Sequence, residues 1–188
     1  MVYLKCVACD DNDESRRVAA RKVRDEMLSR VFGIGNAEGL VIRDNSGRPY
    51  IKNAAFDFSV AHTCKAAVVA ACGEGSESEG GYICENVKIG RIGVDIEREN
   101  REIAPTALKR ICDRFYSEKE KKYVAAGTEG DKRRFLEVWT RKESIVKADG
   151  NGLSGISTAD SFSGALKFIK TDYISVGGEN YILSIAGI

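Results

Sequence analysis

A polar, glycine-rich segment divides this 188-residue chain near its middle. It reads Gly73-Glu-Gly-Ser-Glu-Ser-Glu-Gly-Gly81 and carries no large apolar side chain that could join a core. Segments of this composition form loops or linkers. The length suits either one large domain or two small lobes that share a core. The segment therefore marks a candidate boundary between halves at 1–81 and 82–188.

The spacing of apolar residues predicts both strands and helices, and hence an α+β protein. In the first half it predicts a strand at 2–8, a helix at 13–32 and strands at 56–61 and 66–72. In the second half it predicts a strand at 91–97, a helix after Pro105, a helix with the capping box Ser117-x-x-Glu120, a long helix at 131–149 and strands near 161–169 and 173–185.

The two halves share a short pattern. Each has a helix that ends in a glycine/asparagine turn followed by Gly-Leu, at Gly35-Asn36 to Gly39-Leu40 and at Gly150-Asn151-Gly152-Leu153. Each half then continues into strands. The pattern is short enough to arise by chance, but it also fits two similar lobes.

The charge balance gives no global attraction for nucleic acid. Twenty-nine lysines and arginines against 28 aspartates and glutamates leave a formal net charge of +1, so any anion site must be local. The sequence has no run of about 18 apolar residues that could cross a membrane. The N-terminus lacks the basic start and apolar stretch of a signal peptide. We therefore expect a cytoplasmic protein with no membrane or nucleic-acid partner.

The cysteines and the single histidine narrow the possible chemistry. Without a secretory signal, the six cysteines are expected to be reduced thiols. Cys6 and Cys9 have the spacing of half a zinc or redox motif, but no second Cys-x-x-Cys follows. Core packing is the favoured interpretation of Cys6. A single histidine, His62, excludes a multi-histidine metal site, so acid–base chemistry must use carboxylates, lysines or His62.

Two carboxylates share one face of the predicted strand at 91–97. Side chains alternate along a strand, so Ile92, Val94 and Ile96 point to one side and Asp95 and Glu97 to the other. Residues two apart on a strand lie about 7 Å apart at the backbone, which lets their side chains converge on one cation. Oxygen ligands of this kind suit Mg²⁺. A solvated strand face with ordinary acids is the alternative.

A second group of residues lies on the predicted helix at 131–149. Trp139, Glu143 and Lys147 recur at four-residue spacing and therefore share one stripe of the helix. A carboxylate one turn before a lysine could be a metal ligand or base next to a phosphate-binding cation. The alternative is an exposed ion pair that stabilises the helix by about a few tenths of a kcal/mol.

Together, the two groups resemble the paired motif of the 4′-phosphopantetheinyl transferases. Here the motif reads Gly93-Val94-Asp95, then 43 residues, then Trp139-Thr-Arg-Lys-Glu-Ser-Ile-Val-Lys147. The family pattern is hydrophobic-Gly-hydrophobic-Asp, a long interval, and Trp/Phe-Ser/Thr-x-Lys-Glu-Ala/Ser-x-x-Lys. The resemblance implies transfer of 4′-phosphopantetheine from coenzyme A to a serine of an acyl or peptidyl carrier protein, with Mg²⁺ as the metal cofactor.

Shorter matches lie upstream of this motif. Phe58-Ser-Val-Ala-His62-Thr63 is similar to the family's Phe-Asn/Ser-hydrophobic-Ser-His-Ser segment, whose histidine meets a coenzyme A phosphate. Gly47-Arg48-Pro-Tyr50 is similar to a Gly-Lys-Pro-Tyr segment whose basic residue faces the same cofactor. Arg21 falls where the family places a nucleotide-contacting arginine. Ala61 replaces the usual serine, which would remove one hydroxyl contact. For His62, a histidine satisfied at a strand end is the alternative.

The resemblance also implies roles in the reaction. Asp95, Glu97 and Glu143 would hold Mg²⁺, and Glu143 or a metal-bound water that it positions would be the general base. Lys147 would bind the α-phosphate and assist the departure of 3′,5′-ADP. Lys142 would add positive charge at the same place.

The position of the motif implies a subtype. Asp95 lies in the middle of the chain, after the histidine segment, as in the monomeric, surfactin-synthetase-activating type. That type has two similar α/β lobes related by a pseudo-twofold axis. The resemblance therefore implies a monomer whose lobe 1–81 contributes to coenzyme A binding and whose lobe 82–188 carries the metal site and catalytic helix. A non-catalytic relative that binds coenzyme A or a carrier protein is the alternative. A phosphotransferase acting on another nucleotide has little support, because no Gly-x-x-x-x-Gly-Lys-Ser/Thr loop occurs.

Overall fold

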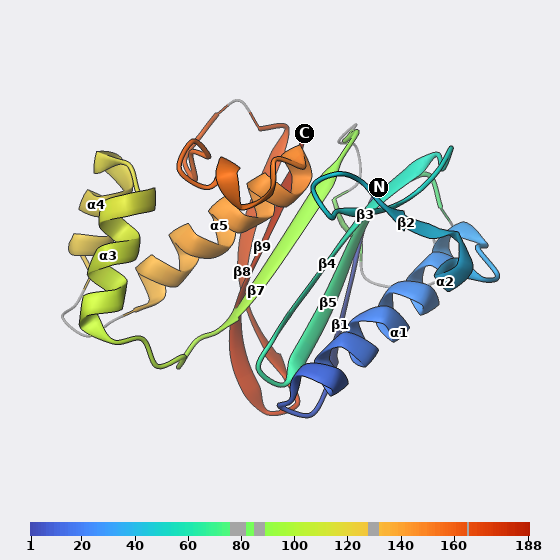
Figure 1. Ribbon diagram of the computed structural model, residues 1–188, viewed down its shortest axis with the longest axis horizontal. Helices are drawn as coiled ribbons and strands as arrows, with labels where there is room; N and C mark the ends of the chain where they lie inside the picture. The colour runs from blue at the N-terminus through green and yellow to red at the C-terminus, as the bar shows by residue number, and fades with distance from the viewer. Residues whose placement is uncertain (76–81, 85–88, 128–131, 165) are drawn as a thin grey trace.

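Two antiparallel sheets lie side by side between helices in this computed structural model (Figure 1). The structure describes residues 1–75, 82–84, 89–127, 132–164 and 166–188. Most of the predicted glycine-rich loop, residues 76–81, lies outside the described residues, as does the predicted start of the long helix at Asp131. None of the helices in the described residues combines the length and the apolar character that crossing a bilayer requires.

The first half of the chain builds a four-stranded sheet covered by one long helix. Its elements are β1 (Val2–Ala8), α1 (Asp13–Phe32), α2 (Ala37–Leu40), β2 (Val41–Arg43), β3 (Pro49–Ile51), β4 (Phe56–Thr63), β5 (Ala66–Gly73) and β6 (Tyr82–Cys84). The strand order is β4-β5-β1-β6, and β2 and β3 form a separate small hairpin. The short strand β6 follows the expected boundary at residue 81 yet pairs with β1 of this first sheet.

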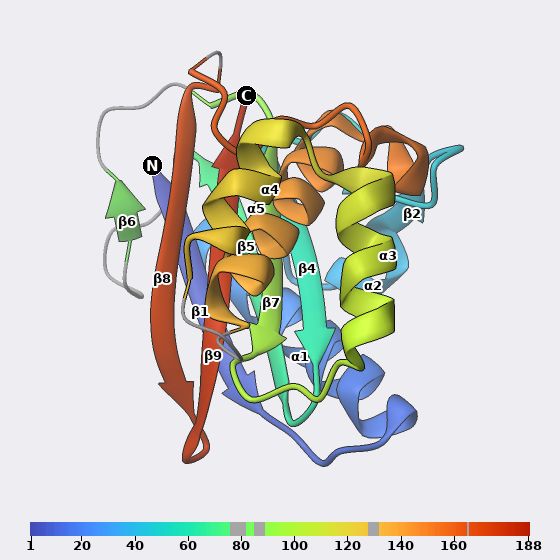
Figure 2. The same ribbon diagram turned by 90° about the vertical axis from the view of Figure 1, so that its left-hand side faces the viewer.

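The second half builds a three-stranded sheet on which one long helix packs, with two shorter helices beside that helix (Figure 2). Its elements are β7 (Ile92–Arg98), α3 (Pro105–Phe115), α4 (Glu118–Ala125), α5 (Arg133–Asp149), a 3₁₀ turn (Gly152–Gly155), β8 (Phe168–Val176) and β9 (Glu179–Gly187). The strand order is β7-β9-β8. Both halves thus run from a strand through a long helix to a hairpin whose second strand lies at the centre.

Local sequence explains where the helices begin and end. The Asn12 side chain accepts a hydrogen bond from the Ser15 backbone at the start of α1, and Gly33 ends that helix in a left-handed conformation. The capping box predicted for α4 is confirmed, since Ser117 and Glu120 bond to each other's backbone N–H groups. Gly150, also left-handed, ends α5.

Apolar side chains form three layers of core. The first layer lies between the two sheets and includes alternate residues of β5, β7 and β9. The second lies between α1 and the first sheet. The third lies between the second sheet and the helices that cover it. Because β5 contributes alternate residues to the first two layers, it is buried on both faces. Cys6 packs against the first layer, as the sequence predicted.

One predicted strand is wrong. The residues near 161–164 form turns, and the strand expected near 161–169 begins only at Phe168. The physical reason is a buried acid: the N–H of Ser161 donates to Glu120 Oε1 at 2.9 Å, which ties this segment to α4. The second strand of the hairpin also lies later than predicted, at Glu179–Gly187.

A glycine sets the distance between β7 and α5. A Cβ atom at Gly93 would lie 1.9 Å from the carbonyl oxygen of Ser144 and 2.6 Å from the N atom of Ala148. Both atoms belong to the backbone of α5, so neither can rotate away. Strand and helix therefore touch through their backbones at this point.

We predict that Gly93→Ala destabilises the protein by about 3 kcal/mol or more, since the added methyl group must push α5 away from the sheet. Urea unfolding followed by circular dichroism measures this change. Gly35→Ala is the matched control, because a Cβ there would meet no atom within 4 Å. Equal stabilities of the two variants would contradict the close contact.

Candidate active site

The two faces of β7 have the roles that the sequence predicted. Ile92, Val94 and Ile96 belong to the core layer between the sheets. Asp95 and Glu97 point to the opposite face, toward α5, and are 8% and 9% exposed. The strand therefore holds two carboxylates in a largely water-free position, where a nearby cation has a strong effect on their energy.

Helix α5 places a carboxylate and an ammonium group opposite this face. Lys147 Nζ lies 2.7 Å from Asp95 Oδ1 and donates to the carbonyl oxygen of Val94 at 3.0 Å. Glu143 lies one turn earlier on the same stripe of the helix. Trp139, one further turn back, packs edge-on against Phe115 of α3. The predicted stripe thus divides into an apolar end and a charged end.

Glu97 has two partners of its own. Arg101, in the loop after β7, forms an ion pair with Glu97 Oε1. The hydroxyl of Thr63, at the end of β4, donates to Oε2 at 3.0 Å. Asp95 and Glu97 therefore each face a cation in this arrangement.

Burial raises the pKa of all three carboxylates, and the charge of Asp95 adds to the shift at Glu97 and Glu143. Burial, followed by the charges of Asp95 and Glu97, raises the pKa of Glu143 to about 7, although Lys147 opposes the shift. Burial and the charge of Asp95 likewise raise the pKa of Glu97. Burial also raises the pKa of Asp95, against the effect of Lys147. Mutual repulsion of this kind shows three acids near enough to interact.

This donor set fits a hard divalent cation in its chemistry. Carboxylate oxygens are the preferred protein ligands of Mg²⁺, and one doubly charged ion would offset the repulsion among the three acids. As the side chains stand, no group of three or more histidine, cysteine, aspartate or glutamate side chains among the described residues is arranged to hold an ion. The carboxylates of Asp95 and Glu97 would have to turn from Lys147 and Arg101 toward the metal.

A pocket of about 270 Å³ opens beside these charges. Its walls come from both halves of the chain: the loop before β3, the middle of β4, and the last turns of α5. The lining residues that carry charge are Arg48, Glu143 and Lys147. Phe58, Val60 and Val146 are among its apolar walls. The pocket therefore combines an apolar wall with two basic side chains and one acid.

The remaining predicted cofactor residues lie in different surroundings. His62 is solvent-accessible near the end of β4, and packing around its imidazole, followed by the charges of Arg16 and Lys147, lowers its pKa. Arg21 is exposed on α1. Arg48 is engaged with protein acceptors, including both carboxylate oxygens of Asp57.

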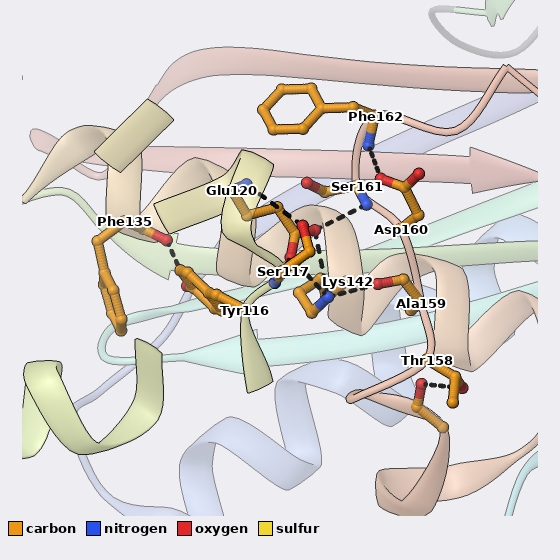
Figure 3. A network of polar contacts seen from close by, with 11 residues as sticks. Tyr116, Ser117, Glu120, Phe135, Lys142, Thr158, Ala159, Asp160, Ser161 and Phe162 are labelled. Carbon is orange, nitrogen blue, oxygen red and sulfur yellow. Dashed lines mark hydrogen bonds and ion pairs between the residues drawn. The ribbon is translucent and has the colours of Figure 1, made fainter. Parts of the chain in front are cut away.

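The structure does not place Lys142 with Lys147. Lys142 is the residue before Glu143, so its side chain is rotated by about 100° around the helix axis and is directed into the protein. Its Nζ lies 3.0 Å from Glu120 Oε2, and the two side chains are 1% and 0% exposed. Nζ also donates to the carbonyl oxygen of Ala159 (Figure 3). The expectation that Lys142 adds charge at the carboxylate site is therefore replaced by a buried ion pair with α4.

Sequence reasoning assigned no role to four residues that bond to the side chain of Glu97 or to the backbone of β7. Thr63 belongs to the matched histidine segment, so its place in that segment was a usable signal. Arg101 lies four residues after Glu97, but loop sequence carries no sign that the chain turns back there. Asp57 and Ser59 accept hydrogen bonds from the β7 backbone. Ser59 also belongs to the matched segment, whereas only the packing of β4 beside β7 reveals the role of Asp57.

Glu143 makes the stability of the metal-free protein depend on pH. Because its pKa is raised in the folded state, folding retains a proton that the unfolded chain releases between about pH 4.5 and 7. Stability from this group is thus present below pH 4.5 and is lost as the pH rises toward 7.

With a metal chelator present, we predict that Glu143→Gln and the unchanged protein are equally stable at pH 4.5. At pH 8 the variant should be more stable by about 3 kcal/mol, because a shift from 4.5 to about 7 corresponds to about 1.4 kcal/mol per pKa unit. Urea unfolding at both pH values tests this, and a difference that does not change with pH would contradict the raised pKa.

Comparison with known protein families gives a match. The family described as the 4′-phosphopantetheinyl transferase superfamily matches residues 91–184, which is half of the chain and includes all of β7, α5 and β8. No individual curated protein matches the sequence. The matched region contains Asp95, Glu97, Glu143 and Lys147, the charged residues that the fold brings together. The chain belongs to the 4′-phosphopantetheinyl transferase superfamily.

Proposed function

We propose that this protein transfers 4′-phosphopantetheine from coenzyme A to a serine hydroxyl of an acyl or peptidyl carrier protein, in a Mg²⁺-dependent reaction. The observation that carries the proposal is the meeting of Asp95 with Lys147, at 2.7 Å, next to Glu97 and Glu143. Membership of the superfamily supports the reaction class and coenzyme A as the donor. The identity of the carrier class and the need for Mg²⁺ are part of the proposal.

Asp95, Glu97 and Glu143 would hold the metal ion. When bound, Mg²⁺ would neutralise negative charge on the oxygens of the phosphoryl group whose phosphorus is attacked. The protein residues contribute a rigid face, since β7 is buried on both sides and Gly93 fixes its distance to α5. Fixed placement of reacting groups lowers the entropic cost of reaching the transition state.

Glu143 is suited to accept the proton of the attacking serine. The pKa of about 7 belongs to the metal-free cluster. A bound divalent cation would lower it, so that Glu143 is ionised and able to accept the proton. Lys147 is suited to bind a phosphate oxygen and to stabilise the departing 3′,5′-ADP, because it lines the pocket and its side chain is 30% exposed.

The pocket is the proposed seat of coenzyme A. Its apolar walls would contact the pantetheine chain, and its charged end would face the pyrophosphate. His62 would contact a peripheral phosphate, which is supported by the proximity of its imidazole to Arg16 and Lys147. Arg21 is exposed and is retained as a proposed nucleotide contact.

We further propose the two-lobe, pseudo-twofold arrangement of the monomeric, surfactin-synthetase-activating type. The shared order of strand, long helix and hairpin in the two halves supports it. So do the contacts of β4 with β7 and of β1 with β8, because such an axis would exchange these two pairs of strands. The division near residue 81, the monomeric state and a cytoplasmic location stay predictions.

Intact-mass spectrometry of a panel of apo carrier proteins tests the proposed activity. After incubation with the protein, coenzyme A and Mg²⁺, at least one carrier should gain the mass of a phosphopantetheine arm. Glu143→Gln should slow this gain by about 10²–10⁴-fold because the general base is removed. The matched control is Glu118→Gln, which alters an exposed ion pair with Lys121 and should keep the full rate.

Two results would contradict the proposal. One is the absence of any modified carrier while coenzyme A binds the folded protein, which would favour a non-catalytic binding role. The other is an unchanged rate for Glu143→Gln, which would remove that residue from the chemistry.

A further inference from the structure

The ion pair between Arg48 and Asp57 lies where four segments of the chain meet. Arg48 precedes β3, and Asp57 is the second residue of β4. Nη1 and Nη2 of Arg48 donate to the two carboxylate oxygens of Asp57 at 2.9 and 2.5 Å. The side chains are only 10% and 14% exposed. A paired, planar contact of this kind fixes the orientation of both groups.

The pair also bonds to the backbone at both ends of the candidate active site. Arg48 Nε donates to the carbonyl oxygen of Lys147 at 2.9 Å, in the last turn of α5. Nη2 donates to the carbonyl oxygen of Ile92 at 3.1 Å, at the start of β7. Asp57 Oδ2 accepts from the N–H of the same Ile92 at 2.8 Å. One ion pair therefore ties the first residue of β7 to the end of α5.

Further residues of β4 also form hydrogen bonds with β7. Ser59 Oγ accepts from the N–H of Val94 at 3.1 Å, and both this bond and the one from Asp57 to Ile92 join residues 35 apart. The equal offset means that the two strands run parallel. Thr63 then reaches the side chain of Glu97. Since β4 and β7 belong to different sheets, these side chains take the place of a backbone ladder between the sheets.

We propose that Arg48 and Asp57 are positioning residues for phosphopantetheine transfer, which hold the carboxylates of β7 in register with Glu143 and Lys147 of α5. This inference rests on the proposed function. Each of the three guanidinium nitrogens of Arg48 donates to a protein acceptor, and Asp57 neutralises its charge. Arg48 therefore lines the pocket without offering a coenzyme A phosphate a free cation, and it acts through the segments that it joins.

The experiment compares Arg48→Lys and Asp57→Asn with the unchanged protein. Lysine keeps the charge but cannot make the paired contact and the backbone contacts together. Asparagine keeps the shape but removes the charge. Both variants should lower kcat for carrier modification by about ten- to a hundredfold, with KM for coenzyme A changed by less than about threefold. Asp113→Asn, which breaks the exposed pair with Lys109, is the control and should change neither constant.

A direct phosphate contact by Arg48 predicts a different result. In that case Arg48→Lys raises KM for coenzyme A at an unchanged kcat, and Asp57→Asn leaves KM unchanged or lowers it because a negative charge is removed. This outcome would overturn the positioning role. Full kcat in both variants would overturn it as well.

Amide hydrogen exchange supplies a readout that needs no turnover. In both variants the N–H of Ile92 should exchange at least about tenfold faster than in the unchanged protein, because it loses its acceptor or the restraint on that acceptor. Unchanged exchange in both variants would overturn the inference. If the unchanged protein modifies no carrier, the proposed function fails, whereas the exchange data still report whether the pair holds β7.

Discussion

The backbone contact between β7 and α5 at Gly93 is the constraint on which the candidate site depends. With no side chain at this residue, the strand lies against the helix at Ser144 and Ala148. The next strand positions on the same face are Asp95 and Glu97, and the neighbouring helix positions include Glu143 and Lys147. The charged groups meet because the two backbones meet. A larger residue at position 93 would push β7 away from α5. The charged side chains would then be separated, although none of them is replaced.

Close approach has an electrostatic consequence. Burial raises the pKa of Glu143 to about 7, and the charges of Asp95 and Glu97 add to the shift. Lys147 and Arg101 offset part of the repulsion among these acids by pairing with Asp95 and Glu97. A divalent cation, as proposed above, would offset the remaining repulsion. The Arg48–Asp57 pair and the bonds from β4 hold the strand while these charges are rearranged.

The sequence predicted the local structure better than the contacts between distant segments. Alternation along β7 separated Asp95 from Ile96 correctly, and the capping box at Ser117 was visible from residue spacing alone. Lys142 was misplaced because its neighbours in the motif face the site, whereas helix geometry turns Lys142 toward a buried Glu120 on α4. That partner is 22 residues away, and no local pattern links the two. The roles of Asp57 and Ser59 depend on β4 lying beside β7, which only the tertiary structure defines.

The most direct test of the account is a titration with Mn²⁺, a paramagnetic substitute for Mg²⁺, in the presence of coenzyme A, followed by electron paramagnetic resonance. We predict one site per chain, weakened by at least about tenfold in each of Asp95→Asn, Glu97→Gln and Glu143→Gln. Asp172→Asn, which alters an exposed ion pair with Lys170, should leave the site unchanged. Equal Mn²⁺ affinity in all four variants and the unchanged protein would contradict a metal site built from these three carboxylates.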